Sequence, residues 1–358
     1  MKNVIKPWGY YIILTRTAAG RHRYLPEGRA AAIRRLRIMR RVIGIAVCGA
    51  AAAAAATGPP PGWRPFADDS PWNTPIPADA AADPRYGDFF ARLAEAEPEA
   101  RLVINIRAWS IPVWWTDVGS APRYDVPTIK WYVFNELVDP DRDRLAEGIP
   151  IPEGATHDPM NDQHMCVADW EAGIAYDFLR AEYHGPGDWR ARSVDVWDLR
   201  GPGVHERGVH SARGSGFPLL AGLILPHELA AGEIRHALAL ATPNCLPQYY
   251  VYPASTTDGG STAELLLPEG ARLQLDPALE VEELGLSPEG EIIARALQVY
   301  GAYVCDNAGA LALYAQQNAA EWKGRLTYDM LSGVPLDRLR VLELPPWQYQ
   351  IRPPWVVR

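Results

Sequence analysis

The sequence predicts a mainly β protein, most simply an antiparallel β-sandwich of the jelly-roll kind with a few short helices. The chain has 358 residues, and 48% of them are hydrophobic, which is enough for a full core. After residue 100 the hydrophobic runs are short, rich in β-branched and aromatic residues, and separated by Pro, Gly, Ser or Asp. Only two longer segments have helical periodicity. An α+β fold with one curved antiparallel sheet is the alternative.

The first 62 residues are predicted to lie outside the folded domain. Basic residues up to Arg41 precede an apolar run and an alanine tract that ends at Ala56. This order is typical of a secretory signal peptide that starts at Met39. We expect export to the extracellular or periplasmic space after cleavage near Ala54 to Thr57. The expected division is residues 1–38 as an upstream extension or long n-region, 39–57 as the signal peptide, 58–62 as a Pro/Gly spacer and 63–358 as a single β-rich domain.

Charge is distributed unevenly between these parts. Residues 1–41 contain 11 of the 35 Lys and Arg residues but only one of the 43 Asp and Glu residues. The remainder therefore has a formal charge of about −18, which disfavours nucleic acid and anionic polymers as partners unless a local basic groove or a metal intervenes. Val42 to Ala56 is shorter than the roughly 20 apolar residues of a membrane-spanning helix, so no stable span is expected. A basic arm that binds nucleic acid or lipid is the alternative reading of residues 1–38.

The domain is expected to begin with an extended arm and a short helix. Residues 66–84 contain repeated prolines and the sequence Ser70-Pro71-Trp72-Asn73, which favours an ordered, extended segment. Residues 86–97 place two phenylalanines and a leucine on one side of a helix. A second helix is predicted at residues 287–298, where Ser287 caps the first turn and Pro288 follows it.

Strands are predicted wherever β-branched and aromatic residues recur between turn residues. The two final strands are expected to pair through a turn at Asn307 to Gly309. Residues 201–216 are predicted to form a glycine-rich loop, and Pro226 to Gly232 a single helical turn. The predicted strands are residues 102–106, 111–115, 130–135, 164–169, 174–183, 189–199, 236–242, 248–252, 273–275, 303–306 and 311–314.

Three cysteines follow the predicted signal peptide, namely Cys166, Cys245 and Cys305. Two of them lie in apolar strand-like runs, so we expect small buried residues rather than a disulfide, although an exported protein could pair two of the three. No Cys/His spacing indicates zinc, and no dinucleotide fingerprint or phosphate-binding glycine loop is present. No cofactor is therefore predicted.

The best candidate for chemistry is Asp162-Gln163-His164 at the start of a predicted hairpin. If Asp169 pairs with Ile174, Cys166 lies opposite Asp177, and the period of two places Asp162, His164 and Asp177 on one face. A histidine flanked by two carboxylates suits general acid/base catalysis or a divalent metal. A slip of one residue in register would move Asp177 to the other face. A histidine that merely bonds a turn aspartate is the alternative.

Other polar residues are candidates of second rank. His236 enters an otherwise apolar strand, where a histidine bonded to the backbone is the simpler interpretation. Asp258 lies in a Thr-Thr-Asp-Gly-Gly loop that could line a site, although Asp-Gly is first a turn signal. Asp306, before Asn307, has the same ambiguity. Ser215 stands between two glycines but lacks the Gly-x-Ser-x-Gly frame of a nucleophile elbow, so a serine hydrolase is not favoured.

Aromatic residues are the remaining functional signal. The chain has 13 Trp and 16 Tyr, many of them beside Pro, Asp or Asn. Flat aromatic faces next to carboxylates can hold sugar rings, whose C–H faces lie on the ring while their hydroxyls bond the polar groups. Ordinary core packing is the alternative for each of them. The residues predicted to bind substrate are Trp72, Tyr176, Trp189 and Trp197.

The part after the signal peptide resembles a group of secreted proteins of high-GC soil bacteria. The resemblance covers nearly all of it, which implies one continuous domain. It brings no established activity, so no residue receives a role from it. The segments that carry the resemblance are Ser70-Pro71-Trp72-Asn73, Pro75-Ile76-Pro77, Asp162-Gln163-His164, Tyr176-Asp177-Phe178 and residues 215–223, 231–238, 253–259, 267–273 and 296–301, the last before Asp306.

Together these observations predict a secreted carbohydrate-active enzyme that acts on an extracellular polysaccharide or oligosaccharide. A glycoside hydrolase needs two carboxylates about the scissile bond, and Asp162 with Asp177 is the best pair that the sequence offers. A polysaccharide lyase is the other enzymatic reading. The expected catalytic residues are Asp162, His164 and Asp177, followed by His236 and Asp258, and a divalent metal could bind the first three. The alternative from another class is a non-catalytic glycan-binding or cell-surface protein.

Overall fold

The structure is a computed structural model, and it describes residues 58–128 and 144–350. The predicted signal peptide, the residues upstream of it and the predicted strand at 130–135 lie outside the described residues. The described part is mainly β, with several sheets of which one is curled into a half-barrel. Within the described ranges, no helix is both long and apolar enough to cross a bilayer.

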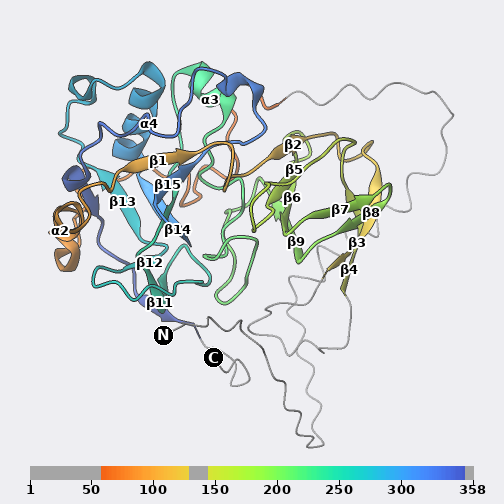
Figure 1. The fold of residues 1–358 in the computed structure, drawn as a ribbon, viewed down its shortest axis with the longest axis horizontal. Helices are drawn as coiled ribbons and strands as arrows, with labels where there is room; N and C mark the ends of the chain where they lie inside the picture. Colours follow the sequence, from red (N-terminus) through yellow and green to blue (C-terminus); the bar gives the residue numbers. More distant parts are fainter. Residues whose placement is uncertain (1–57, 129–143, 351–358) are drawn as a thin grey trace, which may run out of the picture. The chain divides into compact units, whose positions relative to one another are not determined.

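The largest sheet is mixed and has six strands in the order β1-β15-β10-β14-β13-β16 (Figure 1). Its central strands are short and apolar on both faces, as strands covered from two sides must be. Two pairs, β1 with β15 and β10 with β14, run parallel. The strands are β1 (Leu102–Asn105), β15 (Leu311–Tyr314), β10 (Leu238–Thr242), β14 (Ala302–Asn307), β13 (Arg272–Leu275) and β16 (Leu339–Val341).

The predicted pairing of the last two strands through Asn307 to Gly309 is wrong. Strand β10 lies between them, parallel to β14 and antiparallel to β15. The Ala308 N–H donates to the carbonyl of Thr242, 3.0 Å away, so the turn is fixed to the end of β10. These parallel pairs mean that an antiparallel sandwich is not confirmed.

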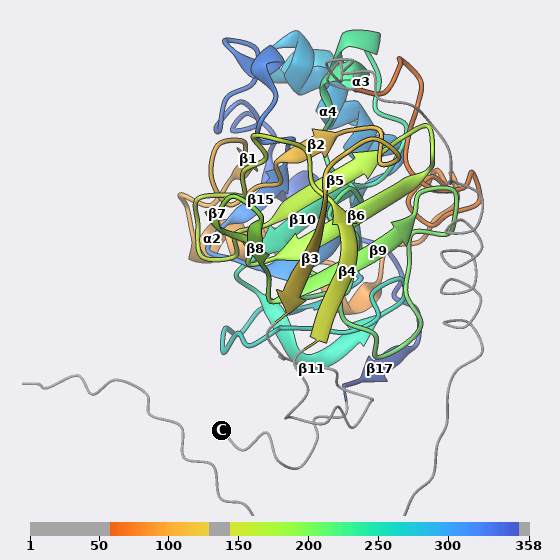
Figure 2. The same ribbon diagram turned by 90° about the vertical axis from the view of Figure 1, so that its right-hand side faces the viewer.

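A second sheet has four strands in the order β2-β5-β6-β9, and Figure 2 shows β5, β6 and β9 side by side. The predicted hairpin register is confirmed, because Asp169 pairs with Ile174 and Cys166 lies opposite Asp177. The predicted strand 174–183 is interrupted at Arg180, whose φ of 51° is left-handed. The strands are β2 (Val113–Trp115), β5 (Met165–Asp169), β6 (Ile174–Leu179) and β9 (Ser193–Asp198).

Smaller sheets complete the strand structure. The pair β3–β4 and the strand β12 were not predicted, because their short sequences lack a clear alternating pattern. Strand β11 of a three-stranded sheet contains a proline, and its register with β12 shifts between Cys245 and Tyr250. The strands are β3 (Arg123–Thr128), β4 (Arg144–Pro150), β7 (Glu182–Gly185), β8 (Asp188–Arg190), β11 (Cys245–Val251), β12 (Leu267–Glu269) and β17 (Trp347–Tyr349).

The helices α2 and α4 pack against the large sheet. In α4 the Gly290 N–H donates to the hydroxyl of Ser287, 3.2 Å away, which confirms the predicted cap. The α3 turn ends at Gly232, whose φ of 82° needs a glycine. The α-helices are α2 (Phe89–Ala96), α3 (Pro226–Ala231) and α4 (Pro288–Val299), and the 3-10 turns are η1 (Pro84–Tyr86), η2 (Val281–Leu284), η3 (Ala320–Trp322) and η4 (Leu336–Arg338).

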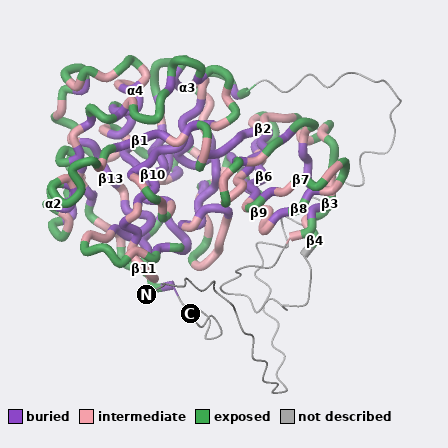
Figure 3. Tube along the Cα trace, in the orientation of Figure 1, coloured by how far each residue is buried: buried purple, intermediate pink, exposed green. Residues whose placement is uncertain are grey.

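Burial follows the central strands (Figure 3). One apolar cluster lies under α2 and α4 against one face of the large sheet. A second joins the other face of that sheet to the four-stranded sheet, and its members include Phe217, Leu219, Leu220, Ala221, Leu223 and Leu225. The N-terminal arm closes this second cluster, because Trp72 is 1% exposed and its indole N–H donates to the carbonyl of Gly203 at 3.0 Å. The three cysteines are free and buried, as predicted.

Candidate functional site

The glycine-rich loop at Arg213 to Gly216 brings together the polar residues of the candidate site. The Gly214 N–H donates to Asp306 Oδ1 at 2.9 Å, and the Ser215 N–H donates to the carbonyl of Cys305 at 3.2 Å. The Ser215 carbonyl in turn accepts a hydrogen bond from the Ser255 N–H at 3.0 Å. The loop is thereby fixed to the end of β14 on one side and to the segment before Asp258 on the other.

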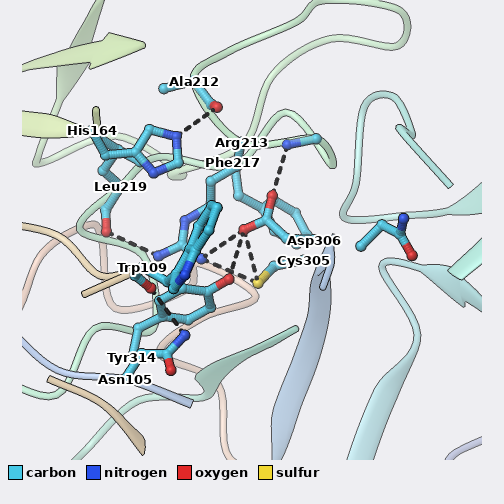
Figure 4. Close-up of polar contacts among 12 residues, drawn as sticks. Asn105, Trp109, His164, Ala212, Arg213, Phe217, Leu219, Cys305, Asp306 and Tyr314 are labelled. Atoms are coloured by element: carbon cyan, nitrogen blue, oxygen red, sulfur yellow. Dashed lines mark hydrogen bonds and ion pairs between the residues drawn. The ribbon is translucent and has the colours of Figure 1, made fainter. Parts of the chain in front are cut away.

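Asp306 receives donors from three directions (Figure 4). Besides the Gly214 N–H, the Arg213 guanidinium and the Tyr314 hydroxyl each lie 3.3 Å from Asp306 Oδ2. Burial raises the pKa of Asp306, and the positive charge of Arg213 acts against that rise. Because its side chain is still 14% exposed, this carboxyl is anchored from below but open to solvent on one side.

Arg213 supports the candidate site from the interior of the protein. Its side chain is fully buried, and its guanidinium carbon lies 4.5 Å from the centre of the Tyr314 ring. It also donates to Cys305 Sγ at 3.1 Å and to the carbonyl of Leu219 at 3.3 Å. A buried cation is stable only with such compensation, so Arg213 fixes the geometry of Asp306 rather than reaching into solvent.

Asp258 and Glu269 form a carboxyl pair beside Asp306. Asp258 is exposed, whereas Glu269 is fully buried behind it, and the Asp258 N–H donates to Glu269 Oε2 at 3.1 Å. Burial raises the pKa of Glu269 well above its usual range, and the Asp258 charge raises it further. Burial also raises the pKa of Asp258, while a hydrogen bond from Glu269 opposes the rise. Burial therefore favours the protonated form of Glu269, which is hydrogen-bonded to Asp258.

His164 and Asp162 complete the group. The ring Nε2 of His164 lies 3.1 Å from the carbonyl of Ala212. A carbonyl only accepts, so this nitrogen carries the hydrogen and Nδ1 is the nitrogen that can take up a proton. Burial lowers the pKa of His164, against the charges of Asp162 and Asp306. Asp162 also acts on the pKa of Asp258 through its charge. His164 is therefore neutral near pH 7.

Asp177 does not join this group, although its predicted register is right. It is fully buried in β6, and its Oδ2 accepts a hydrogen bond from the Leu219 N–H at 2.6 Å. Burial raises its pKa to about 6, while the Leu219 N–H and Cys166 act in the opposite direction. The pair of Asp162 and Asp177 therefore does not flank an open space, because the segment that carries Leu219 covers Asp177.

His236 also belongs to another part of the structure. It is 1% exposed, and its Nε2 lies 2.8 Å from Glu228 Oε1 in α3. Burial lowers the pKa of His236, but the charge and hydrogen bond of Glu228 outweigh burial and the net shift is upward. The contacts of His236 are thus those of a buried ion pair, and no described contact joins it to Asp306.

The four aromatic residues predicted to bind substrate are interior residues in this structure. Trp72, Tyr176, Trp189 and Trp197 are 1%, 7%, 5% and 4% exposed. Their ring faces are occupied by protein neighbours, since large aromatic side chains supply much of the apolar area that a core buries.

Trp109, by contrast, is 43% exposed and is anchored beside the acidic group (Figure 4). Its φ of 54° is left-handed, and Asn105 Nδ2 donates to its carbonyl at 3.0 Å. Asn105 itself pairs with Tyr314 across β1 and β15. An open aromatic face therefore lies next to the residues that hold Asp306.

The structure thus brings together Asp162, His164 and Asp258 and adds residues that the sequence analysis did not select. The sequence leaves Asp306 ambiguous, and it does not single out Arg213, which lies in the predicted glycine-rich loop at residues 201–216. Glu269 carried no signal, because a single glutamate in a Leu-Pro-Glu-Gly segment looks like a turn residue. The clustering of glycines at Gly214 and Gly216 was the one local sign that backbone approaches polar groups closely there.

Among the described residues, no group of three or more His, Cys, Asp or Glu side chains is placed to hold an ion. A divalent metal at Asp162, His164 and Asp177 stays a prediction. An exposed acid of raised pKa, an anchored carboxyl and a neutral imidazole are suited to proton transfer. Comparison with known proteins gives no assignment: no family model, no curated protein and no solved structure shows significant similarity to this chain.

Proposed function

We propose that this protein is a secreted glycoside hydrolase that cleaves an extracellular polysaccharide by acid/base catalysis at Asp258 and Asp306. The observation that carries the proposal is the contrast between these two carboxyls. Asp258 is exposed and hydrogen-bonded to the buried Glu269, whereas Asp306 accepts hydrogen bonds from four donors and lies beside the Arg213 charge. Burial raises the pKa of both carboxyls, and the nearby charge of Arg213 is the reason to assign Asp306 as the carboxylate and Asp258 as the proton donor.

In this mechanism Asp258 donates a proton to the glycosidic oxygen, and the bond from that oxygen to the anomeric carbon breaks. Asp306 stabilises the positive charge that develops on the sugar, or directs the water that attacks it. His164, neutral and with Nδ1 as its basic nitrogen, can accept the proton that the water releases. The exposed indole of Trp109 offers a face for the adjoining sugar ring.

The test is release of reducing ends from a panel of polysaccharides by the wild-type protein, Asp258→Asn and Asp306→Asn. Each variant is expected to lose at least about 100-fold in kcat with little change in thermal stability. Asp79→Asn, at an exposed position, is the matched control. Full activity of either Asp258→Asn or Asp306→Asn would contradict the proposal. Growth of absorbance at 235 nm, from an unsaturated product, would instead identify a polysaccharide lyase that uses His164 as its base.

A non-catalytic glycan-binding protein is the second candidate, and one observation favours it. Tyr249, Trp347 and Tyr349 form an exposed ring cluster on β11 and β17, with ring centres 5.9 Å and 5.2 Å from Tyr249. Exposed aromatic faces of this kind bind sugars without any catalytic group. Retention on a polysaccharide that no condition cleaves, lost in Trp347→Ala, would favour this second function.

A further inference from the structure

A cleft of about 250 Å³ lies outside the candidate site, between the N-terminal arm and the turn that joins β5 to β6. Its walls include the indoles of Trp63 and Trp170 and the side chains of Arg64, Asp68 and Arg200. Aromatic faces, two cations and a carboxylate thus converge on one hollow. Small-molecule sites commonly combine apolar walls with a few such polar groups.

The walls of this cleft are held by the backbone rather than by flexible side chains. The Phe66 N–H donates to the carbonyl of Leu199 at 2.6 Å, and the Leu199 N–H donates to the carbonyl of Gly173 at 2.8 Å. Phe66 has a left-handed φ of 74°, a strained conformation that surrounding contacts must maintain. The cleft is therefore formed before any ligand enters, which lowers the entropic cost of binding.

The charges in the cleft do not cancel. Arg64 Nη2 lies 2.7 Å from Asp68 Oδ1, so these two neutralise each other. Arg200 donates to the carbonyls of Ala172 and Glu171 instead, and among the described residues no carboxylate forms an ion pair with its guanidinium. Among the residues that line the cleft, the guanidinium of Arg200 is thus the one charge without an ion-pair partner, and the nearest carboxylate with a described contact, Asp198, accepts the Arg200 backbone N–H at 2.9 Å. In a domain whose overall charge is strongly negative, this is a local preference for an anion.

Two hydrogen bonds to carbonyls hold Arg200 against the turn at Gly173. A Cβ at Gly173 would lie 2.8 Å from the guanidinium carbon, and the φ of 72° at this residue also favours glycine. The guanidinium still has N–H groups beyond the two that bond carbonyls, and a planar fork of this kind matches the two oxygens of a carboxylate. The indoles favour a ring with C–H faces.

We propose that this cleft binds a uronic acid residue of a polysaccharide, with the sugar ring against Trp170 and its carboxylate paired with Arg200. The choice of a sugar polymer rests on the proposed function, while the preference for a carboxylated sugar rests on the cleft itself. The cleft is then a second contact with an acidic polymer, separate from the residues that cleave it, and the uncleaved chain would gain affinity by engaging both places.

The test measures protection of single tryptophans against oxidation by N-bromosuccinimide, read by mass spectrometry, in the full protein carrying Asp258→Asn. Tetragalacturonate is expected to protect Trp170 but not Trp347, which is exposed on β17, and cellotetraose is expected to protect neither. Arg200→Gln should raise the half-protecting concentration at least tenfold, and added salt should raise it in the parent protein. Arg190→Gln, an exposed arginine paired with Asp188, is the matched control.

Equal protection of Trp170 by both oligosaccharides, or no effect of Arg200→Gln, would overturn the proposal. The assay can separate failure of this proposal from failure of the proposed function. It measures oxidation of Trp170 in the Asp258→Asn variant, so its result does not depend on cleavage of the polysaccharide. If the wild-type protein cleaves no polysaccharide while tetragalacturonate still protects Trp170, uronate binding in the cleft is supported and the hydrolase function is contradicted. Trp170→Ala gives a second check, since binding of the uronate measured by calorimetry should then weaken without a change in the unfolding midpoint.

Discussion

The Asp258 carboxyl lies directly against the backbone of Gly214: a Cβ at position 214 would be 2.3 Å from Asp258 Cγ and 2.4 Å from Asp258 Oδ1. Glycine at this position therefore allows the carboxyls of Asp258 and Asp306 to contact the same loop, since the Gly214 N–H also donates to Asp306. A close approach of backbone to a functional group is one of the few reasons for which a chain needs glycine.

Gly214→Ala should consequently displace Asp258, whose side chain is exposed and free to move outward. We expect kcat for polysaccharide cleavage to fall by about 100-fold, because a shift of about 1 Å in a catalytic group can cost that much. Thermal unfolding should change little. Gly309→Ala is the control, since a Cβ there meets nothing within 4 Å. Equal activity of the two variants would show that Asp258 does not act in catalysis.

Arg213→Met should change the pH dependence of the reaction. The Arg213 charge opposes the rise in the pKa of Asp306 that burial causes, so its loss should raise that pKa. If Asp306 acts as a carboxylate, the acidic limb of kcat/KM moves to higher pH by about one unit. Initial rates between pH 3 and 8 measure this. Arg325→Met, in an exposed pair with Glu289, should leave the limb in place.

The ion pair of His236 and Glu228 should make stability depend on pH. The pKa of His236 in the folded protein is raised above 6.5. The ion pair therefore stabilises the folded protein fully below about pH 6.5, and this contribution is lost as pH rises through the pKa that His236 has in the folded state. His236→Asn should lower the free energy of unfolding by about 3–5 kcal/mol at pH 6, because it leaves a buried charge without its partner. Urea unfolding at pH 6 and pH 9 should show a smaller loss at the higher pH.

His184→Asn provides the comparison for this experiment. His184 Nε2 lies 2.9 Å from Glu182 Oε2, but both side chains are about two-fifths exposed, and such surface pairs contribute about 0–1 kcal/mol. A loss in His236→Asn no larger than that in His184→Asn would contradict the buried ion pair.

Asp177→Asn should make the protein more stable at high pH. The pKa of Asp177 is raised from 3.8 to about 6 by burial, so its favourable contribution is complete below about pH 3.8 and is lost as pH rises through about 6. An asparagine oxygen can still accept from the Leu219 N–H. We expect a gain of up to roughly 3 kcal/mol at pH 8 and none at pH 3.5, measured by denaturant unfolding. Destabilisation at pH 8 would mean that the ionised carboxylate is needed.

The local part of the fold could be read from the sequence, and the long-range part could not. The register of Cys166 opposite Asp177 followed from one turn and the period of two, and it is confirmed. The placement of β10 between β14 and β15 depends on strands about 60 to 70 residues apart, for which no local pattern exists. Turn residues at Asn307 to Gly309 indicated a reversal of the chain but not what lies between its two arms.

The candidate site divides in the same way. His164 and Asp162 were selected because they stand together in the sequence, and Asp258 because a glycine-rich loop can line a site. Arg213 and Glu269 were not selected, because buried charges become informative only when their neighbours are known. The four interior aromatics show the converse: a count of Trp and Tyr does not distinguish a packed ring from an open one.

The docking of Trp72 has a consequence for how the chain folds. The arm that carries it closes the second core through partners far along the chain: Ser70 bonds the carbonyl of Pro202, and the hydroxyl of Tyr303 bonds the carbonyl of Pro71. A segment made early in synthesis therefore cannot reach its place until strands made more than 200 residues later exist. Contacts of this separation slow folding. The arm is expected to dock last, and its removal to expose the apolar cluster that Phe217 and Tyr303 form with Trp72.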